Sequence, residues 1–392
     1  MVAAVIPILD PDLQAELLLL EARGRSRSCP AVAGSSRTSP TVDAQPLVSF
    51  CSNDYLGLSG HPALAAAATA AIARSGFGAS ASRLVAGDLP EHRELEAALS
   101  AFLNMEAALL FPSGYQTNLG VLAALAAPGD LVLSDHANHA SIIDACRLSR
   151  ARTSFYRHLD VSSAEKRLLA LAPTARRKLL VTESLFGMDG DIAPLADLAA
   201  LATKHGAALV VDEAHALGLL GPGGRGLCNE AGVTPDVLIG TLGKAFGSAG
   251  GFAAGSSTLR KYLVNRSRTF IFTTAPPPPV AAAALAALDI IRGNEGSARR
   301  AALADRVLQF QGRLPPKARG LPGSPVFPIV LGPDRAALEA SGALRARGFF
   351  VQPIRPPTVP DGTARLRITL SASHRPADVD ALALAVAPLI PQ

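Results

Sequence analysis

The stretch TLGKAFGSAGG, residues 241–251, encloses a single lysine among small residues, and an apolar run comes directly before it. Its glycines allow a bulky ligand to approach the backbone closely. An amine among apolar neighbours has a lowered pKa, because desolvation disfavours its charged form, and a Schiff-base lysine needs that property. We therefore interpret Lys244 as a lysine that binds a carbonyl cofactor. The alternative is that it only solvates a loop.

A second stretch, VVDEAH, residues 210–215, ends an apolar run in an acid, and a histidine follows three residues later. Open α/β sheets bind their ligands at the carboxyl ends of the strands, which is where Asp212 would lie. The pattern therefore indicates a ligand-binding acid. The alternative is that Asp212 only caps the turn after its strand.

A third stretch, FPSGYQTN, residues 111–118, places Ser113 and Gly114 between a strand and a helix. Backbone N–H groups at a helix start bind anions, so a phosphate would suit this turn. Pyridoxal 5′-phosphate requires an acid for its ring nitrogen, a lysine for its imine and an anion site for its phosphate. The three stretches, in this order and each at a strand end, predict a site for that cofactor.

Around these stretches, short apolar runs alternate with segments of helical period from residue 107 onward. This alternation is typical of βαβ units and of a mainly parallel sheet, so the expected fold class is α/β. The predicted strands are residues 107–111, 131–133, 178–182, 207–211, 237–241 and 251–254. The predicted helices include residues 119–127, 139–149, 194–204 and 257–265.

The pattern changes after four consecutive prolines at 276–279. An alanine-rich helix over 280–291 is expected to bridge two domains. Beyond it we expect a smaller α+β domain, with strands at 326–331, 349–352 and 365–370 and helices at 334–347 and 376–389. The resulting division is an N-terminal arm (1–45), a large domain (46–289) and a small C-terminal domain (290–392).

The composition argues against several classes of protein: nucleic-acid-binding, membrane-spanning, disulfide-rich and zinc-binding. The chain has 392 residues and a net charge of +5, and its basic residues form no stripe with interleaved aromatics, which argues against a nucleic-acid partner. No apolar run is long enough for a membrane span, and the N-terminus has no basic region typical of a signal peptide. The four cysteines form no CxxC pair, so we expect a cytoplasmic protein without a disulfide framework or a zinc site.

The chain resembles the α-oxoamine synthase family of fold-type I pyridoxal-phosphate enzymes, and within it the branch of the biotin pathway. The resemblance covers nearly the whole chain. It is carried by the stretches SNDYLGL (52–58), 78–87, SGY (113–115), NHAS (138–141), TE to DG (182–190), DEAH (212–215), TLGK (241–244) and FTT (272–274).

The resemblance implies a decarboxylative condensation of L-alanine with a pimeloyl thioester, carried by coenzyme A or acyl carrier protein. It implies that Lys244 forms the Schiff base, that Asp212 contacts the ring nitrogen and His215 the ring hydroxyl, and that His139 stacks on the ring. The alternatives are purely structural roles: His139 would only begin a helix, and His215 would only form hydrogen bonds within a turn. Two further hypotheses stay open: use of glycine or serine with another acyl group, and a cofactor-binding protein of low turnover.

The resemblance also implies contacts to the phosphate and a homodimer with shared active sites. The residues it assigns to the phosphate and its loop are Ser113, Gly114, Tyr115 and Thr241. Thr273 or Thr274 would reach the phosphate of the neighbouring subunit, unless Thr273 is ordinary strand filler.

For the substrates, the resemblance points to Asn53 and to the stretch IRPPTVP, residues 354–360. A rigid Pro-Pro segment would fix Arg355, and a fixed guanidinium is suited to gripping a carboxylate with two hydrogen bonds. We expect that carboxylate to be the one of alanine. The family also places an arginine of the arm near the acyl substrate, and three candidates fit: Arg23, Arg25 and Arg27.

The chain departs from the family pattern at two positions. Gly187 stands where the family commonly has serine, so we expect a hydroxyl contact near the cofactor to be missing. Ala216 stands where glycine usually follows the DEAH stretch, and its additional methyl group is expected to be tolerated.

Overall fold

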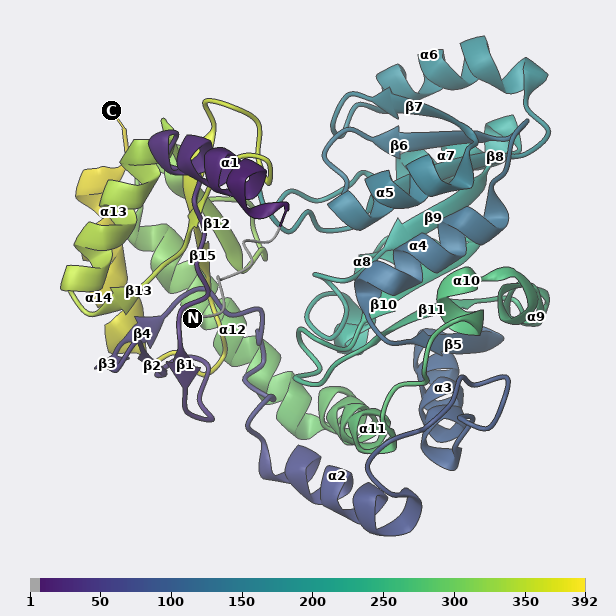
Figure 1. The fold of residues 1–392 in the computed structure, drawn as a ribbon, viewed down its shortest axis with the longest axis horizontal. Helices are drawn as coiled ribbons and strands as arrows, with labels where there is room; N and C mark the ends of the chain where they lie inside the picture. The colour runs from purple at the N-terminus through teal and green to yellow at the C-terminus, as the bar shows by residue number, and fades with distance from the viewer. Residues whose placement is uncertain (1–7, 392) are drawn as a thin grey trace, which may run out of the picture.

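The structure is a computed structural model that describes residues 8–391, and it folds them around two separate main sheets (Figure 1). A seven-stranded sheet lies at the right of the view and a three-stranded sheet at the left, near the C-terminus. Helix α12 (Asn294–Arg313) runs between them. The α/β class with a large sheet and a smaller α+β unit is confirmed.

The large sheet is mainly parallel, as the sequence predicts. Its strands β10, β9, β8, β6 and β7 pair in parallel, while β11 runs antiparallel to both of its neighbours. In spatial order the strands are β5 (Ala107–Phe111), β11 (Gly251–Gly255), β10 (Val237–Thr241), β9 (Ala208–Asp212), β8 (Lys178–Glu183), β6 (Leu131–Asp135) and β7 (Arg152–Tyr156). Strand β7 was absent from the sequence-based expectation, because RTSFY contains no apolar run.

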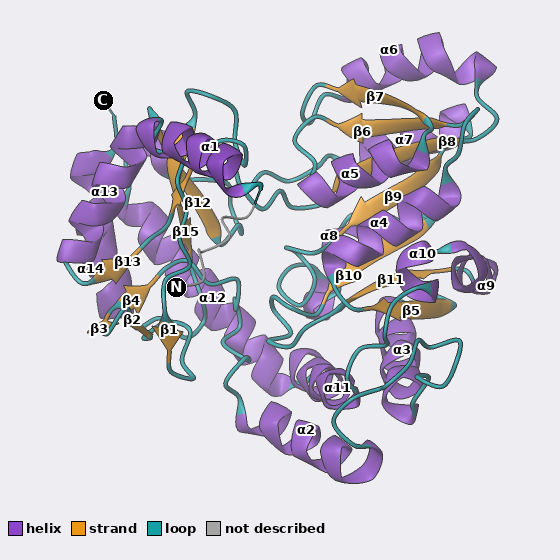
Figure 2. Ribbon diagram, viewed as in Figure 1, coloured by secondary structure: helices purple, strands orange, loops and turns teal. Residues whose placement is uncertain are grey.

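Helices cover both faces of this sheet (Figure 2). In β6, Leu131 and Leu133 join the apolar cluster on one face and Val132 joins the cluster on the other. Burial on both faces explains why the strands read as unbroken apolar runs. One face carries α4 (Gly114–Leu125), α5 (Ala140–Ser149), α9 (Ser257–Arg266) and α10 (Arg268–Ile271). The other carries α2 (Pro62–Ser75), α3 (Pro90–Leu103), α6 (Val161–Leu171), α7 (Leu195–His205), α8 (Leu227–Glu230) and α11 (Pro278–Arg292).

The small sheet consists of three strands and is packed against helices. Its strands in spatial order are β12 (Val326–Gly332), β15 (Ala364–Thr369) and β14 (Pro353–Ile354), and its helices are α12, α13 (Asp334–Ala346) and α14 (Pro376–Val386). The expectation of one strand over 349–352 is wrong. Only its first two residues form a strand, β13 (Phe349–Phe350), which pairs with β4 (Val48–Ser49), and the separate strand β14 begins after the segment and pairs with β15.

The prediction that the helix over 280–291 bridges the two domains is wrong. Helix α11 forms where it was predicted, but it packs on α2 and α3 at the large sheet. The longer α12 makes the connection and packs against α14. A single apolar cluster continues from α2, α3 and α11 through α12 into the small sheet, so the two sheets share one hydrophobic core.

The N-terminal arm lies beside the small sheet (Figure 1). It contains α1 (Asp10–Ala22), none of whose residues is buried, and a small sheet of β1 (Val32–Ala33), β2 (Thr41–Val42) and β3 (Gln45–Pro46). Within residues 8–391, no helix combines the length and hydropathy needed to cross a membrane.

Candidate active site

The predicted site residues converge at one edge of the large sheet. Asp212 ends β9, Glu183 ends β8 and Thr241 ends β10, and these strands are parallel, so their last residues share the carboxyl edge. Because β11 is antiparallel, its first residue, Gly251, lies opposite Thr241 and Phe111 at this same edge. Ligands of open α/β sheets bind at this edge.

Lys244 lies in the turn after β10, and the turn is closed by its own backbone. The N–H of Ser248 donates to the carbonyl of Leu242 at 2.9 Å, and the N–H of Gly247 donates to that of Lys244 at 2.8 Å. Gly247 has φ +63°, and a Cβ there would lie 2.4 Å from the nitrogen of Ser59, so no other residue fits. The glycines of this stretch therefore fix the position of the lysine.

The electrostatics of Lys244 agree with the expectation for a Schiff-base lysine. Burial lowers the pKa of Lys244, the charges of Asp212 and Glu183 oppose that shift, and the charge of Arg367 adds to it. The pKa of Glu183 is raised, because the carboxyl is buried and lies near Asp212. The amine is thus easier to deprotonate than an exposed lysine.

Asp212 caps the turn after its strand and makes one further side-chain contact. Its Oδ1 accepts the N–H of Ala214 at 2.9 Å, which is the expected cap of the turn. Its buried Oδ2 accepts from Nδ2 of Asn118 at 2.7 Å, and Asn118 also donates to Oγ of Ser141 at 3.0 Å. Among the described residues, the buried Oδ1 of Asn118 has no hydrogen-bond partner. A buried carboxylate held by an amide goes beyond what a turn requires.

His139 caps a helix and still presents its ring. Its Nδ1 bonds Oγ of Ser141 at 2.7 Å at the start of α5, while its backbone N–H donates to Oε1 of Glu183 at 2.6 Å. The residue is exposed, and the ring of Tyr115 meets it edge-on at a centroid distance of 6.4 Å. The capping role therefore leaves a ring face free to stack on a ligand.

His215 is buried beside Tyr55. Its Nδ1 lies 2.7 Å from Oη of Tyr55. Burial lowers the pKa of His215 well below its usual range, and the nearby charges of Lys244 and Arg367 lower it further. Its Nε2 faces Gly187, where a Cβ would lie only 2.1 Å away. The missing side chain at 187 thus leaves the space that the imidazole occupies.

Arg367 was not identified as a site residue from the sequence. The side chain is buried in β15, where Nε donates to the carbonyl of Gly187 at 2.6 Å and Nη1 to Oγ1 of Thr369 at 3.0 Å. Its charge lowers the pKa of Lys244, as stated above. The available signal was the alternation of arginines with apolar residues in the strand ARLRIT, all six residues of which are buried.

The predicted phosphate residues lie together at the start of α4. Oγ of Ser113 accepts the N–H of Gln116 at 3.1 Å, which caps the helix. A Cβ on Gly251 would lie 2.7 Å from the nitrogen of Gly114, and a Cβ on Gly114 would lie 3.4 Å from Oγ1 of Thr241. The first N–H groups of a helix have no partner within it, so this glycine-lined turn can receive an anion.

Other predicted residues lie away from this turn or are engaged elsewhere. Tyr115 donates a hydrogen bond from Oη to Asp144 on α5. Thr273 and Thr274 belong to the segment between α10 and α11, and within residues 8–391 their side chains make no hydrogen bond. Oδ1 of Asn53 accepts a long hydrogen bond, 3.4 Å, from Tyr55.

Arg355 is buried against the N-terminal arm. Its guanidinium donates to the carbonyls of Gly24 and Ser26, the latter at 3.2 Å, and its buried Nε has no partner among the described residues. Arg27 donates from Nη2 to the carbonyl of Pro356 at 2.7 Å. The pKa of Arg355 is lowered mainly by burial and further by the charge of Arg27. Two guanidinium groups thus lie close together.

Comparisons with a family model, with related sequences and with solved structures all point to the same family. Residues 45–386 match the class I and II aminotransferase family. The chain is 51% identical over 381 residues to an 8-amino-7-oxononanoate synthase of Anaeromyxobacter dehalogenans (strain 2CP-1 / ATCC BAA-258), covering 96% of this chain and 95% of the relative. It is similar to a serine palmitoyltransferase from S. paucimobilis with PLP and myriocin bound (TM-score 0.90, 31% identity, 98% of each chain). It is also similar to 8-amino-7-oxononanoate synthase from Francisella tularensis (TM-score 0.74, 28% identity, 87% of this chain and 97% of that one).

Proposed function

Because the chain belongs to the class I and II aminotransferase family, in its α-oxoamine synthase group, we propose that it condenses L-alanine with a pimeloyl thioester. The products are 8-amino-7-oxononanoate, carbon dioxide and the free thiol carrier. The observation that carries the reaction class is the placement of Lys244 beside Asp212 at the carboxyl edge of the sheet. The substrates follow from the relative that is 51% identical over nearly the full chain.

The residues present fit pyridoxal 5′-phosphate, the cofactor of this family. Asp212 offers a buried carboxylate for the ring nitrogen, Lys244 an amine of lowered pKa for the carbonyl carbon, and Gly114 a turn with free N–H groups for the phosphate. When bound, the cofactor withdraws electrons from the α-carbon of the amino acid.

This chain's own residues move the proton. The lowered pKa of Lys244 makes its amine easier to deprotonate, so Nζ would serve as the base that removes the proton from the α-carbon of alanine. Asp212 would hold the ring nitrogen of the cofactor in its protonated form. His215, whose pKa is lowered, is neutral and forms a hydrogen bond rather than adding a charge.

The cofactor attachment is tested directly. Borohydride reduction of the holoenzyme followed by peptide mapping is expected to place the modification on Lys244. In Lys244→Ala no covalent cofactor is expected, with the far-ultraviolet circular dichroism unchanged. Modification of any other lysine would contradict the assignment.

For the α-carboxylate of alanine we propose Arg355, with Arg367 as the competing candidate. Arg355 combines a buried guanidinium with an unpartnered Nε, which suits a further anionic acceptor. Arg367 is favoured by a different observation, since its charge acts on Lys244 itself. The two residues are separated by kinetics, as described in the Discussion.

For the distal carboxylate of the acyl substrate we propose Arg27 among the three arginines of the arm. Arg25 is already neutralised by Asp334, at 2.7 Å, and by Asp361. Within residues 8–391, the hydrogen bonds of Arg27 go only to backbone carbonyls, so its charge is available to a ligand.

We further propose a cytoplasmic homodimer. Two large apolar side chains are exposed: Phe272, next to Thr273, is 70% exposed, and Val85 is 81% exposed. Val85 lies in the loop before α3, and this loop meets the segment of Thr273 because the N–H of Ala275 donates to the carbonyl of Ala81 at 3.0 Å. A second copy covering these residues would bring Thr273 or Thr274 to the phosphate of its neighbour. Sedimentation at micromolar concentration tests this, and a monomer with full activity would contradict it.

Substrate choice is tested with a panel of amino acids and acyl thioesters. We expect alanine to exceed glycine in kcat/KM by about tenfold or more, since one methyl group in a closed pocket is worth about 1–3 kcal/mol. We expect alanine to exceed serine as well, because burying the additional hydroxyl costs free energy unless it finds a hydrogen-bond partner. In the same panel we expect a higher kcat/KM for pimeloyl than for palmitoyl thioesters. The panel also measures whether kcat/KM is higher with coenzyme A or with acyl carrier protein as the thiol carrier. Preference for serine or glycine would assign the chain to another reaction of this group.

A further inference from the structure

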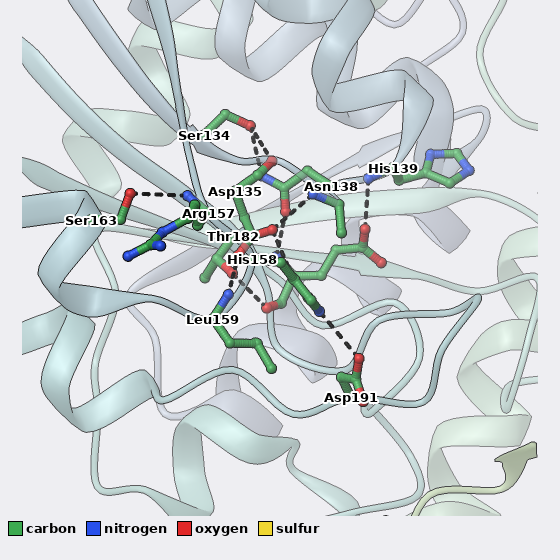
Figure 3. A network of polar contacts seen from close by, with 12 residues as sticks. Ser134, Asp135, Asn138, His139, Arg157, His158, Leu159, Ser163, Thr182 and Asp191 are labelled. Carbon is green, nitrogen blue, oxygen red and sulfur yellow. Dashed lines mark hydrogen bonds and ion pairs between the residues drawn. The ribbon is translucent and has the colours of Figure 1, made fainter. Parts of the chain in front are cut away.

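His158 bridges two carboxylates beside the site (Figure 3). It follows β7, and its Nδ1 lies 2.8 Å from Oδ1 of Asp135 while its Nε2 lies 3.2 Å from Oδ2 of Asp191. A neutral imidazole has one N–H, so it can donate to only one of two carboxylates. Both bonds together require the doubly protonated ring.

The electrostatics support this protonation state. Burial alone would lower the pKa of His158, but the hydrogen bonds to Asp135 and Asp191 outweigh burial and raise the pKa to about 9. The ring also packs edge-on against Phe186 at a centroid distance of 4.4 Å. The positively charged His158 therefore links two segments that are far apart in sequence, one containing Asp135 and the other Asp191.

One of these segments presents His139. Oδ1 of Asp135 also accepts the N–H of Ala137 at 2.8 Å, at the start of the loop between β6 and α5. Asn138 anchors that loop to β8, because its Oδ1 accepts the N–H of Glu183 at 3.0 Å. The next residue is His139, whose N–H donates to the carboxylate of Glu183.

The other segment is the turn after β8 that borders His215. The N–H of Phe186 donates to the carbonyl of Asp191 at 2.9 Å, which closes the turn. Gly187 lies inside it, touches His215 and accepts from Nε of Arg367 at 2.6 Å. A displacement of Asp191 would therefore reach both His215 and Arg367.

We propose that His158 is a positioning residue that fixes the His139 loop and the Gly187 turn relative to each other at the proposed cofactor site. The proposal rests on the proposed function for the identity of the cofactor. If the proposal holds, removing the His158 bridge changes how the ring of the bound cofactor is held, although His158 itself touches no substrate.

The test compares His158→Gln with His136→Gln as a matched control. Glutamine has one amide donor group and no charge, so it cannot bridge the two carboxylates. His136 is exposed and lies in the same loop as Asn138. For His158→Gln we expect a kcat lower by about tenfold or more, as for small misplacements of reacting groups, with the KM of both substrates within about twofold. The induced circular dichroism of the bound cofactor should also change, while the control keeps all these values.

Asp191→Asn provides the second variant, because Asp191 is partly exposed and its replacement is less disruptive to folding. If the bridge acts as a unit, the double variant His158→Gln/Asp191→Asn loses no more activity than the worse single variant. Additive losses, or a His158→Gln enzyme with wild-type kcat and wild-type cofactor circular dichroism, would overturn the proposal. The circular dichroism needs no substrate, so it decides the proposal even if alanine and the pimeloyl thioester are not turned over.

Discussion

Nε2 of His215 lies where a side chain on residue 187 would begin: a Cβ on Gly187 would be 2.1 Å from it. The family commonly has serine at this position, and the expectation from sequence was a missing hydroxyl. The structure adds a steric relationship to this, since the glycine leaves space for a buried imidazole whose Nδ1 bonds Tyr55 at 2.7 Å.

We therefore predict that Gly187→Ser lowers kcat by about tenfold, because the imidazole must move and its bond to Tyr55 is strained or lost. Gly342→Ser is the matched control, because a Cβ there meets nothing within 4 Å. Steady-state kinetics with both substrates measures the effect. Equal kcat in the two variants would show that His215 adjusts at no cost.

Asp212→Asn is expected to lower turnover by about 10²- to 10⁴-fold, the usual range for loss of an acid–base partner. An amide cannot keep the ring nitrogen protonated, yet the phosphate turn at Gly114 is unchanged. The cofactor dissociation constant should therefore rise much less than kcat falls. Fluorescence titration of the apoprotein and single-turnover kinetics measure the two quantities, and wild-type turnover in the variant would exclude the role of Asp212.

Arg355→Ala is expected to cost about 2–4 kcal/mol in alanine binding, the range for a charge-assisted bidentate contact in a partly dry site. This corresponds to roughly thirtyfold to several-hundredfold in affinity. Arg355→Lys should recover only part of the loss, because lysine lacks the planar fork. The exposed Arg335, paired with Glu339 at 2.9 Å, provides the control Arg335→Ala.

The same titrations distinguish the competing assignments. Unchanged alanine affinity with weakened acyl-thioester binding would move Arg355 to the distal carboxylate. In that case Arg367→Gln should show the alanine defect instead.

The buried His374 predicts a pH dependence of folding stability. Burial lowers the pKa of His374 to about 4, and Nε2 bonds the carbonyl of Ser49 at 2.9 Å. Between this value and about 6.5 the unfolded chain binds the additional proton, so stability falls as the pH falls through that range, by up to about 3 kcal/mol. In His374→Gln this part of the slope should vanish, whereas His136→Gln should keep it. Urea titrations from pH 7 to pH 4.5 measure the difference, and parallel slopes in all three proteins would contradict it.

The sequence predicted those parts of the site that depend on strand ends. Asp212, Thr241, Lys244 and Gly114 directly follow or end apolar runs, and parallel strands bring such positions to one edge. Arg367 and Tyr55 could not be placed in this way, because they are 312 residues apart and meet only when the loop between β4 and α2 packs against β15. The roles of Thr273 and Thr274 stay predictions, since they concern a neighbouring subunit.

Local patterning also explains where the fold prediction was incomplete. Strand β7 was missed because it is at the edge of the sheet, where an apolar run is not required. The segment 349–352 was predicted as one strand because its composition is continuous, but only Phe349 and Phe350 pair as a strand, with β4, while the carbonyl of Gln352 accepts from the N–H of Arg367 in β15. Pairing of this kind is set by tertiary contacts and not by the period of the segment.

The central claim is the decarboxylative condensation, and carboxyl-labelled alanine tests it most directly. The holoenzyme is incubated with 1-¹³C-alanine and pimeloyl-coenzyme A, and the labelled gas and the organic product are measured together. The account predicts one equivalent of ¹³CO₂ for each equivalent of unlabelled 8-amino-7-oxononanoate. Formation of pyruvate with the label retained and no carbon dioxide would contradict it, because the chain would then transfer the amino group instead of forming a carbon–carbon bond.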